Sequence, residues 1–199
     1  MKNKMLKKRW MVISLSFIIY HLSFSPVGAQ VKMSDVIKQM PDTLVPYLKQ
    51  NALLDFIDFK DSGMKAEVSN DLGGKSQLVE LSDDYALFTL NAASQIQMRL
   101  LDVQEPVDSA NQILCMVRTF GSDICESTIG FYSVRWRPLP LGQRIALPSY
   151  MHRIVLSAQA PELTVEQETG MDVPANEEQK KIEKTLISFK WDGKVFKIY

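Results

Sequence analysis

The chain has 199 residues, and its 23 basic side chains balance its 23 acidic ones. Five of the basic residues fall within the first nine positions and no acidic residue precedes residue 30, so residues 30–199 carry 18 basic and 23 acidic side chains, a net charge of −5. A negative net charge argues against nucleic acid and anionic membrane surfaces as partners. The 170 residues from 30 to 199 suit one domain with a sizeable core.

The first 29 residues have the pattern of a secretory signal peptide. Basic residues open the chain, residues 10–24 form an apolar run, and Val27-Gly28-Ala29 offers small residues at a cleavage site after Ala29. The run contains four polar positions and is shorter than the roughly 20 apolar residues that span a bilayer, which favours cleavage over a membrane anchor. We expect a soluble, periplasmic or secreted product with no stable membrane anchor after cleavage.

Helices are expected directly after the signal peptide. Ser34, followed by an aspartate, can cap a first helix, and Pro41 and Pro46 interrupt the next two turns of chain. Asn51 can cap a second helix, whose apolar residues recur at helical spacing up to Gly63. We expect this helix to lie on the apolar face of a sheet.

Four β-hairpins are predicted, because turn residues separate pairs of strand-like runs. The paired runs are residues 66–72 with 75–81, 85–90 with 95–101, 113–119 with 124–136, and 185–191 with 194–199. Successive hairpins imply a meandering antiparallel sheet. The predicted fold class is therefore α+β, with N-terminal helices packed on a largely antiparallel, meandering β-sheet built from successive hairpins, in a single globular domain over residues 30–199.

The turns also predict which residues face each other. A two-residue turn in the last hairpin pairs Phe189 with Phe196 on the core face and leaves Lys190 on the solvent face. A two-residue turn in the first hairpin sets Glu67 opposite Glu80. Facing carboxylates destabilise a strand pair unless they are neutralised, so either a cation binds there or another register is formed.

The part of the chain between the third and last hairpins is less regular. Prolines at 138, 140 and 148 break its pattern, and residues 153–157 resemble a strand. The acidic residues 162–172 indicate an edge strand or an exposed loop, and residues 177–184 indicate a short solvent-facing helix.

Cys115 and Cys125 are the chain's two cysteines. In an oxidising compartment such a pair forms either a short-range disulfide or two buried thiols, and both remain open. A bridge would contribute about 3 kcal/mol in the chain-entropy account. The predicted hairpin sets Cys115 opposite Thr128 and Cys125 opposite Arg118, so a bridge requires a shift of register.

The strongest concentration of arginine and aromatic residues lies in the middle of the chain. Arg135 and Arg137 alternate with Trp136 at a predicted strand end, so both guanidinium groups share one face and the indole takes the other. That face suits an anionic ligand or an acidic protein partner. Alternatively, the arginines pair with the excess carboxylates and Trp136 packs in the core. The candidate interaction surface comprises Arg118, Tyr132, Arg135, Trp136 and Arg137.

Catalytic and cofactor motifs are weak in this sequence. After cleavage His152 is the single histidine, which argues against a multi-histidine zinc site. The Gly74-Lys75-Ser76 segment lacks the opening glycine and following helix of a phosphate-binding loop. Aspartates 55, 58 and 61 recur along one predicted helix and are interpreted as a solvated face rather than a calcium site. We expect no cofactor, metal or catalytic residue.

Short segments between residues 40 and 139 are informative as an ordered set. They are Met40-Pro41-Asp42, Pro46-Tyr47-Leu48, Ile57-Asp58-Phe59, Met64-Lys65-Ala66-Glu67-Val68, Leu72-Gly73-Gly74-Lys75-Ser76, Asp83-Asp84-Tyr85, Glu126-Ser127-Thr128-Ile129, Phe131-Tyr132, and Trp136 with Pro138-Leu139. In this order and spacing the chain resembles a family of small exported proteins of unknown function from Bacteroides-type (Bacteroidales) Gram-negative bacteria. The resemblance implies export but no activity, so it transfers no catalytic residue.

The leading hypothesis is a soluble, non-enzymatic periplasmic module that binds an envelope protein or polymer. One alternative is a hydrolase of envelope or dietary polymer that uses two carboxylates, for which Glu67 and Glu80 are the pair with a geometric argument. Glycosidase carboxylates lie roughly 5 to 9.5 Å apart, so a structure can discriminate between the two. Another alternative is a structural subunit of an envelope assembly.

Overall fold

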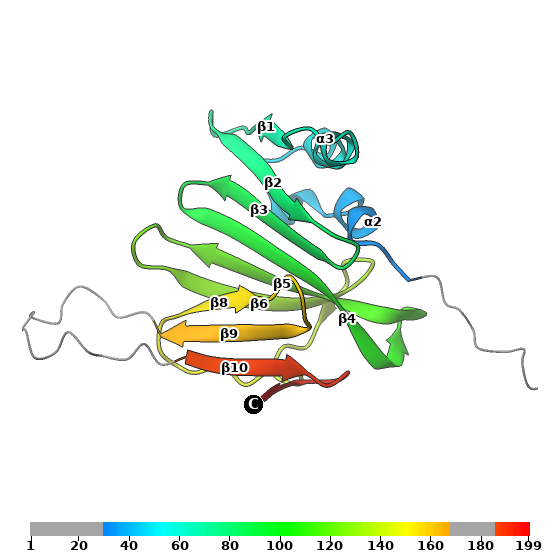
Figure 1. The fold of residues 1–199 in the computed structure, drawn as a ribbon, viewed down its shortest axis with the longest axis vertical. Helices are drawn as coiled ribbons and strands as arrows, with labels where there is room; N and C mark the ends of the chain where they lie inside the picture. Colours follow the sequence, from blue (N-terminus) through cyan, green and yellow to red (C-terminus); the bar gives the residue numbers. More distant parts are fainter. Residues whose placement is uncertain (1–29, 168–185) are drawn as a thin grey trace, which may run out of the picture.

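The computed structural model describes residues 30–167 and 186–199. Strands are the main secondary structure of this part of the chain and form two antiparallel sheets (Figure 1). The larger sheet has the order β1-β2-β3-β4-β5-β6-β7, so each strand pairs with its neighbours in sequence. The smaller sheet has the order β11-β10-β9-β8.

The helical elements of the described residues precede the sheets and are α2 (Met33–Lys38), the 3-10 helix η1 (Asp42–Leu44) and α3 (Gln50–Asp61). The strands of the larger sheet are β1 (Glu67–Ser69), β2 (Lys75–Leu81), β3 (Tyr85–Asn91), β4 (Ser94–Val107), β5 (Ala110–Phe120), β6 (Glu126–Ser133) and β7 (Pro138–Leu139). Those of the smaller sheet are β8 (His152–Leu156), β9 (Glu162–Gln167), β10 (Leu186–Trp191) and β11 (Phe196–Ile198).

The expected α+β class is wrong. The described residues are predominantly β, and the chain builds two sheets rather than one sheet covered by helices. The difference arises after residue 138, where the segment that looked irregular forms β8 and β9 and joins the last hairpin in a sheet of its own. The antiparallel arrangement of the strands is confirmed. The predicted signal peptide, the predicted helix at 177–184 and the acidic segment beyond residue 167 lie outside the described residues.

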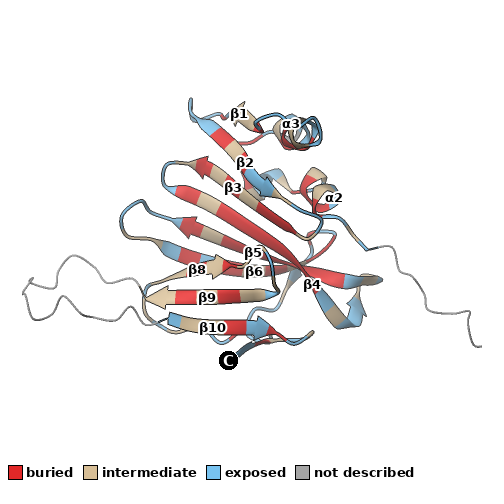
Figure 2. Cartoon of the chain, in the orientation of Figure 1, coloured by how far each residue is buried: buried red, intermediate tan, exposed pale blue. Residues whose placement is uncertain are grey.

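The two faces of the larger sheet carry two separate apolar cores. Along β4, Met98 and Leu100 point into a helix-side core that includes residues of α2 and α3. Leu101 points the other way, into an inter-sheet core that includes β8, β9 and β10. This alternation follows the period of two of a β-strand. The middle of β4 is therefore buried on both faces, as Figure 2 shows.

All four predicted hairpins form, but three of their registers differ from the expectation. Glu67 lies opposite Gln77, three residues from the expected Glu80. Thr119 lies opposite Ser127 instead of Ile124, and Phe189 lies opposite Ile198 instead of Phe196. A shift of three exchanges the faces of a strand, whereas a shift of two preserves them, so the last hairpin keeps its core face.

The second hairpin divides its apolar residues between the two faces of the larger sheet. Tyr85 and Leu87 belong to the inter-sheet core, whereas Ile96, Met98 and Leu100 belong to the helix-side core. The pairing of Tyr85 with Arg99 sets this alternation.

The first register shift is caused by a turn that uses a side chain. The side-chain oxygen of Asn70 accepts the backbone N–H groups of Leu72 and Gly74, each at 3.1 Å, and its amide nitrogen donates to Ser76 Oγ at 3.0 Å. Asn70 is buried, so these bonds fix a loop longer than the predicted two-residue turn.

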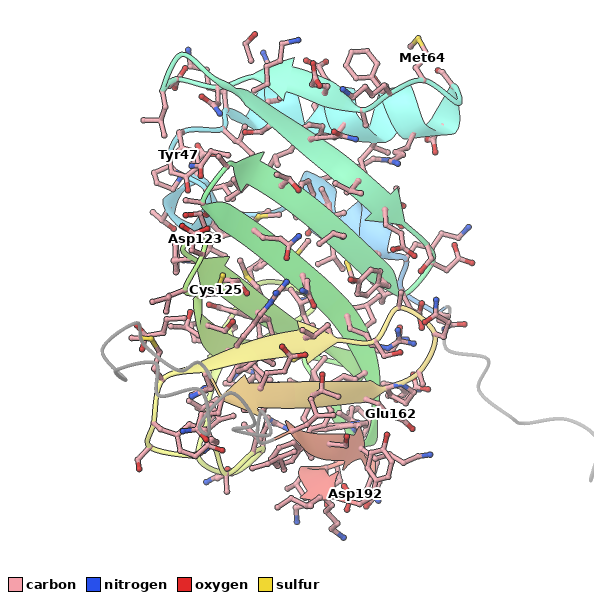
Figure 3. The ribbon with its side chains drawn as sticks, turned by 60° about the vertical axis from the view of Figure 1, so that its left-hand side comes forward. Tyr47, Met64, Asp123, Cys125, Glu162 and Asp192 are labelled. Atoms are coloured by element: carbon pink, nitrogen blue, oxygen red, sulfur yellow. The ribbon has the colours of Figure 1, made fainter. Side chains whose placement is uncertain are left out.

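The last hairpin also closes through a longer turn. The Asp192 carboxylate accepts the backbone N–H groups of Lys194 at 2.9 Å and Val195 at 2.8 Å, and Trp191 instead pairs with Phe196. The Lys197 ammonium, followed by these two backbone donors, lowers the pKa of Asp192 to about 2. The turn and Glu162 lie at the same end of the molecule in Figure 3.

Among the described residues, every helix is too short or too polar to cross a membrane.

Candidate functional site

The two sheets are joined by buried polar side chains. The backbone N–H of Leu156, on edge strand β8, donates to Gln97 Oε1 at 2.6 Å. The N–H of Ile154 donates to Ser127 Oγ at 3.0 Å. A buried N–H group without a partner is costly, so the two side chains from the larger sheet complete the edge of the smaller one.

Strands β4 and β5 extend beyond their neighbours as a two-stranded arm, which we define as residues 102–112. In the described part of the chain, β3 begins at Tyr85 and β6 ends at Ser133, so no strand flanks the arm. Figure 1 shows it projecting below α2. Asp108 and Ser109 turn the chain at its tip with φ of 50° and 66°, as a two-residue hairpin turn requires.

The base of the arm is fixed by hydrogen bonds from both sides. Gln112 is 4% exposed; its Oε1 accepts the Val31 N–H at 3.1 Å, and its Nε2 donates to Asp102 Oδ1 at 3.1 Å. The Trp191 indole N–H donates to the Asp102 carbonyl at 2.6 Å. The arm is therefore held between the N-terminal segment and the smaller sheet.

Three cavities meet the arm. The largest, about 550 Å³, lies between the arm, α2 and the turn after β6. A second, of about 290 Å³, lies between the arm base, Arg99 and Trp191, and it shares Gln30, Asp102 and Gln112 with the first. A third, of about 270 Å³, lies beside residues 103–107. Ligand sites typically occupy about 300 to 1,000 Å³, a range that contains the largest cavity.

The predicted interaction surface is only partly assembled. Arg137 makes a two-bond ion pair with Asp108, with Nη2 2.6 Å from Oδ1 and Nε 3.1 Å from Oδ2. The Arg137 guanidinium, together with Ser133, lowers the pKa of Asp108. Arg135 is exposed and lines the largest cavity. The two arginines therefore do not form the free cationic face that the sequence predicted.

Trp136 is a core residue. Strand β6 ends at Ser133, so the expected alternation of residues 135–137 on a strand is wrong, and Trp136 takes a left-handed φ of 65° in a turn. Its indole is 7% exposed, donates to the Val36 carbonyl at 2.9 Å and lies 5.6 Å from the Tyr132 ring. Both aromatic rings therefore pack beneath the turn and belong to the helix-side core.

Arg118 is separate from this group. It lies opposite Thr128, whereas Tyr132 lies opposite Leu114. Four residues along a strand correspond to about 13 Å. The structure thus brings Tyr132, Arg135, Trp136 and Arg137 together at one end of β6, and it places Arg118 towards the other end.

The predicted carboxylate pair does not form. Glu67 is held by Lys65 and Lys75, whose hydrogen bonds lower the pKa of its carboxyl to about 2. Glu80 lies on β2 opposite Leu87, with its side chain exposed. The facing carboxylates on which the hydrolase hypothesis depended are a product of the wrong register. Within residues 30–167 and 186–199, no three His, Cys, Asp or Glu side chains gather as metal ligands would.

The two cysteines are free thiols. Cys115 is buried opposite Phe131, and burial raises the pKa of its thiol. Cys125 lies in the turn before β6, with its sulfur 3.6 Å from the Gly121 carbonyl (Figure 3). The register of β5 and β6 separates the cysteines by six positions, or about 20 Å, which is too far for a disulfide.

Comparison with known proteins places the fold in context. Residues 26–154, more than half of the chain, match the model of a family described as "Protein of unknown function (DUF3256)". A solved domain of an uncharacterized protein from Porphyromonas gingivalis W83 is similar, with a TM-score of 0.70 and 16% identity over 86% of this chain and 99% of that one. At this identity the similarity shows the fold alone. Among curated proteins, none matches.

Proposed function

Because the chain belongs to the DUF3256 family, whose function is unknown, we infer its role from its own surface. We propose that it is an exported, non-enzymatic module that binds an envelope protein or polymer at the arm. The observation that carries this proposal is the convergence of three cavities on residues 102–112. A projecting element between concave surfaces gives a partner several walls to contact at once.

The fixed base of the arm supports the same proposal. Besides the bonds made by Gln112 and Trp191, the Gln104 N–H donates to the Gly193 carbonyl at 3.1 Å and its side chain donates to the Asp192 carbonyl at 3.1 Å. Binding residues that are held in place lose little conformational freedom when a partner docks.

Photo-crosslinking in cells of the source organism tests the binding site. A photoreactive amino acid at Asn111, which is exposed and lines the largest cavity, is expected to give a discrete adduct with an envelope component. Asn51 is an equally polar, exposed position on α3 and serves as the matched control, from which no such adduct is expected. Adducts of the same kind from both positions, or none from Asn111, would contradict the proposal.

Export is the second part of the proposal, and the basic, apolar and small-residue regions of residues 1–29 support it. The protein recovered from the source organism is expected in the soluble periplasmic or secreted fraction. Its intact mass should match a chain that begins at Gln30. A full-length species that sediments with membranes would overturn it.

A further inference from the structure

We infer that the two cavities sharing Gln30, Asp102 and Gln112 form one groove that takes an extended, basic segment of a partner protein, with a lysine or arginine head group on the Asp102 carboxylate. We call this feature the central groove. The inference rests on the proposed binding function and specifies the chemistry of the partner.

The charges around the central groove are unequally compensated. Asp84 is paired with the buried Arg99 at 2.8 Å, and Asp108 is paired with Arg137. Arg135 also acts electrostatically on Asp108, so the cations at that end of the groove already have a carboxylate nearby. An acidic partner would therefore compete with Asp108 for Arg137.

Asp102 is the exception in the shared wall. Among the described residues its side chain has one hydrogen-bond partner, the neutral Gln112 amide, and no cation within ion-pair distance. Gln112 is 4% exposed and is itself bound to Val31, so it holds the carboxylate in one orientation. A fixed carboxylate with unused acceptor positions is complementary to an ammonium or guanidinium group.

The other walls suit the backbone of a peptide. Gln30, Gln39 and Asn111 line the larger cavity and offer amide donors and acceptors. An extended segment carries unpaired N–H and C=O groups that such side chains can satisfy. The combination of amide walls around one carboxylate favours a basic protein segment over a purely anionic polymer.

The test is an NMR titration of the purified protein with a capped peptide of alternating serine and lysine. The side-chain amide of Gln112 reports directly on the Asp102 carboxylate, to which it donates, and the indole N–H of Trp191 reports on the Asp102 backbone, because it donates to the Asp102 carbonyl. The lysine peptide is expected to shift both resonances, and the matched glutamate peptide is expected to shift neither. Because Asp102 is exposed, an ion pair between its carboxylate and a lysine of the peptide should contribute only modestly to the affinity. Asp102→Asn should therefore weaken binding about two- to fivefold.

The matched control is Asp123→Asn, which makes the same change of charge in the exposed turn before β6 (Figure 3). Equal loss of affinity in the two variants, or equal shifts from both peptides, would overturn the inference. A crosslink at Asn111 combined with no response to the lysine peptide leaves the binding module standing and rejects the basic partner. A response to the lysine peptide without any crosslink rejects the envelope partner of the proposed function and leaves the preference of the groove for a basic segment standing.

Discussion

Replacing Phe189 with alanine is expected to lower the free energy of unfolding by about 3 to 5 kcal/mol. Phe189 lies on β10 in the inter-sheet core, opposite Leu163, and is 2% exposed. Truncation removes its contacts with that core and leaves a cavity that the surrounding strands can fill only in part. Urea titration, with the slope of the transition compared between variants, measures the loss.

The neighbouring Lys190 provides the control for this experiment. Its side chain is exposed and pairs with Glu162 at 3.2 Å, so Lys190→Ala should change stability by about 0.5 kcal/mol or less. Equal midpoints for the two variants would mean that the strand presents its other face to the core.

Replacing Gln97 with methionine is expected to lower the free energy of unfolding by about 1 to 3 kcal/mol, because the Leu156 N–H loses its acceptor inside the protein. Methionine has a similar length, so the change removes a hydrogen bond more than it removes packing. The local stability of β8 should fall by more than the stability of the whole fold. Hydrogen exchange at the Leu156 amide is expected to accelerate while amides at the centre of β3 remain protected.

Gln95→Met is the control, since Gln95 lies two residues away on the same face of β4; its side-chain oxygen accepts a long bond from Gln97 Nε2 at 3.4 Å, but no bond joins it to β8 in the described structure. In the Gln95→Met variant, the backbone amides of β8 should exchange at the same rate as in the unchanged protein. Faster exchange at Leu156 in both variants would show that polarity of the sheet face, rather than the single bond, protects the edge strand.

The hairpins were predictable because turns and alternation are local properties. Gly73 adopts a positive φ of 76° and Gly193 one of 94°, as their places in the predicted turns suggest. Registers were not predictable from two-residue turns, because Asn70 and Asp192 each use a side-chain oxygen to fix a longer loop. Such side-chain bonds depend on the folded geometry of several residues.

The second sheet was missed because its evidence is nonlocal. Residues 153–157 and the acidic segment from 162 gave weak strand patterns, and the bonds that the Ile154 and Leu156 N–H groups donate to Ser127 and Gln97 of the larger sheet link residues far apart in sequence. One signal was present in the sequence. Gln97 and Arg99 interrupt an otherwise apolar run on β4, and a polar residue in such a strand indicates a buried partner.

The candidate site was predicted in part. The sequence identified Arg135, Trp136 and Arg137, which do lie beside the largest cavity or support it. It did not identify Asp102 or Gln112, because the N-terminal segment and Trp191 that fix them are distant in sequence. Asp102 and Gln112 lie at the base of the arm because β4 and β5 extend beyond the neighbouring strands, which only the folded structure shows.

The separation of the apolar residues into two cores gives the protein a pair of built-in optical probes. Trp136 lies in the helix-side core and Trp191 in the inter-sheet core, and each is 7% exposed. The third tryptophan, Trp10, precedes the described residues. Fluorescence from chains that retain only Trp136 or only Trp191 therefore follows each side of the larger sheet by itself, and it reveals whether the two sides melt in one cooperative step or in succession.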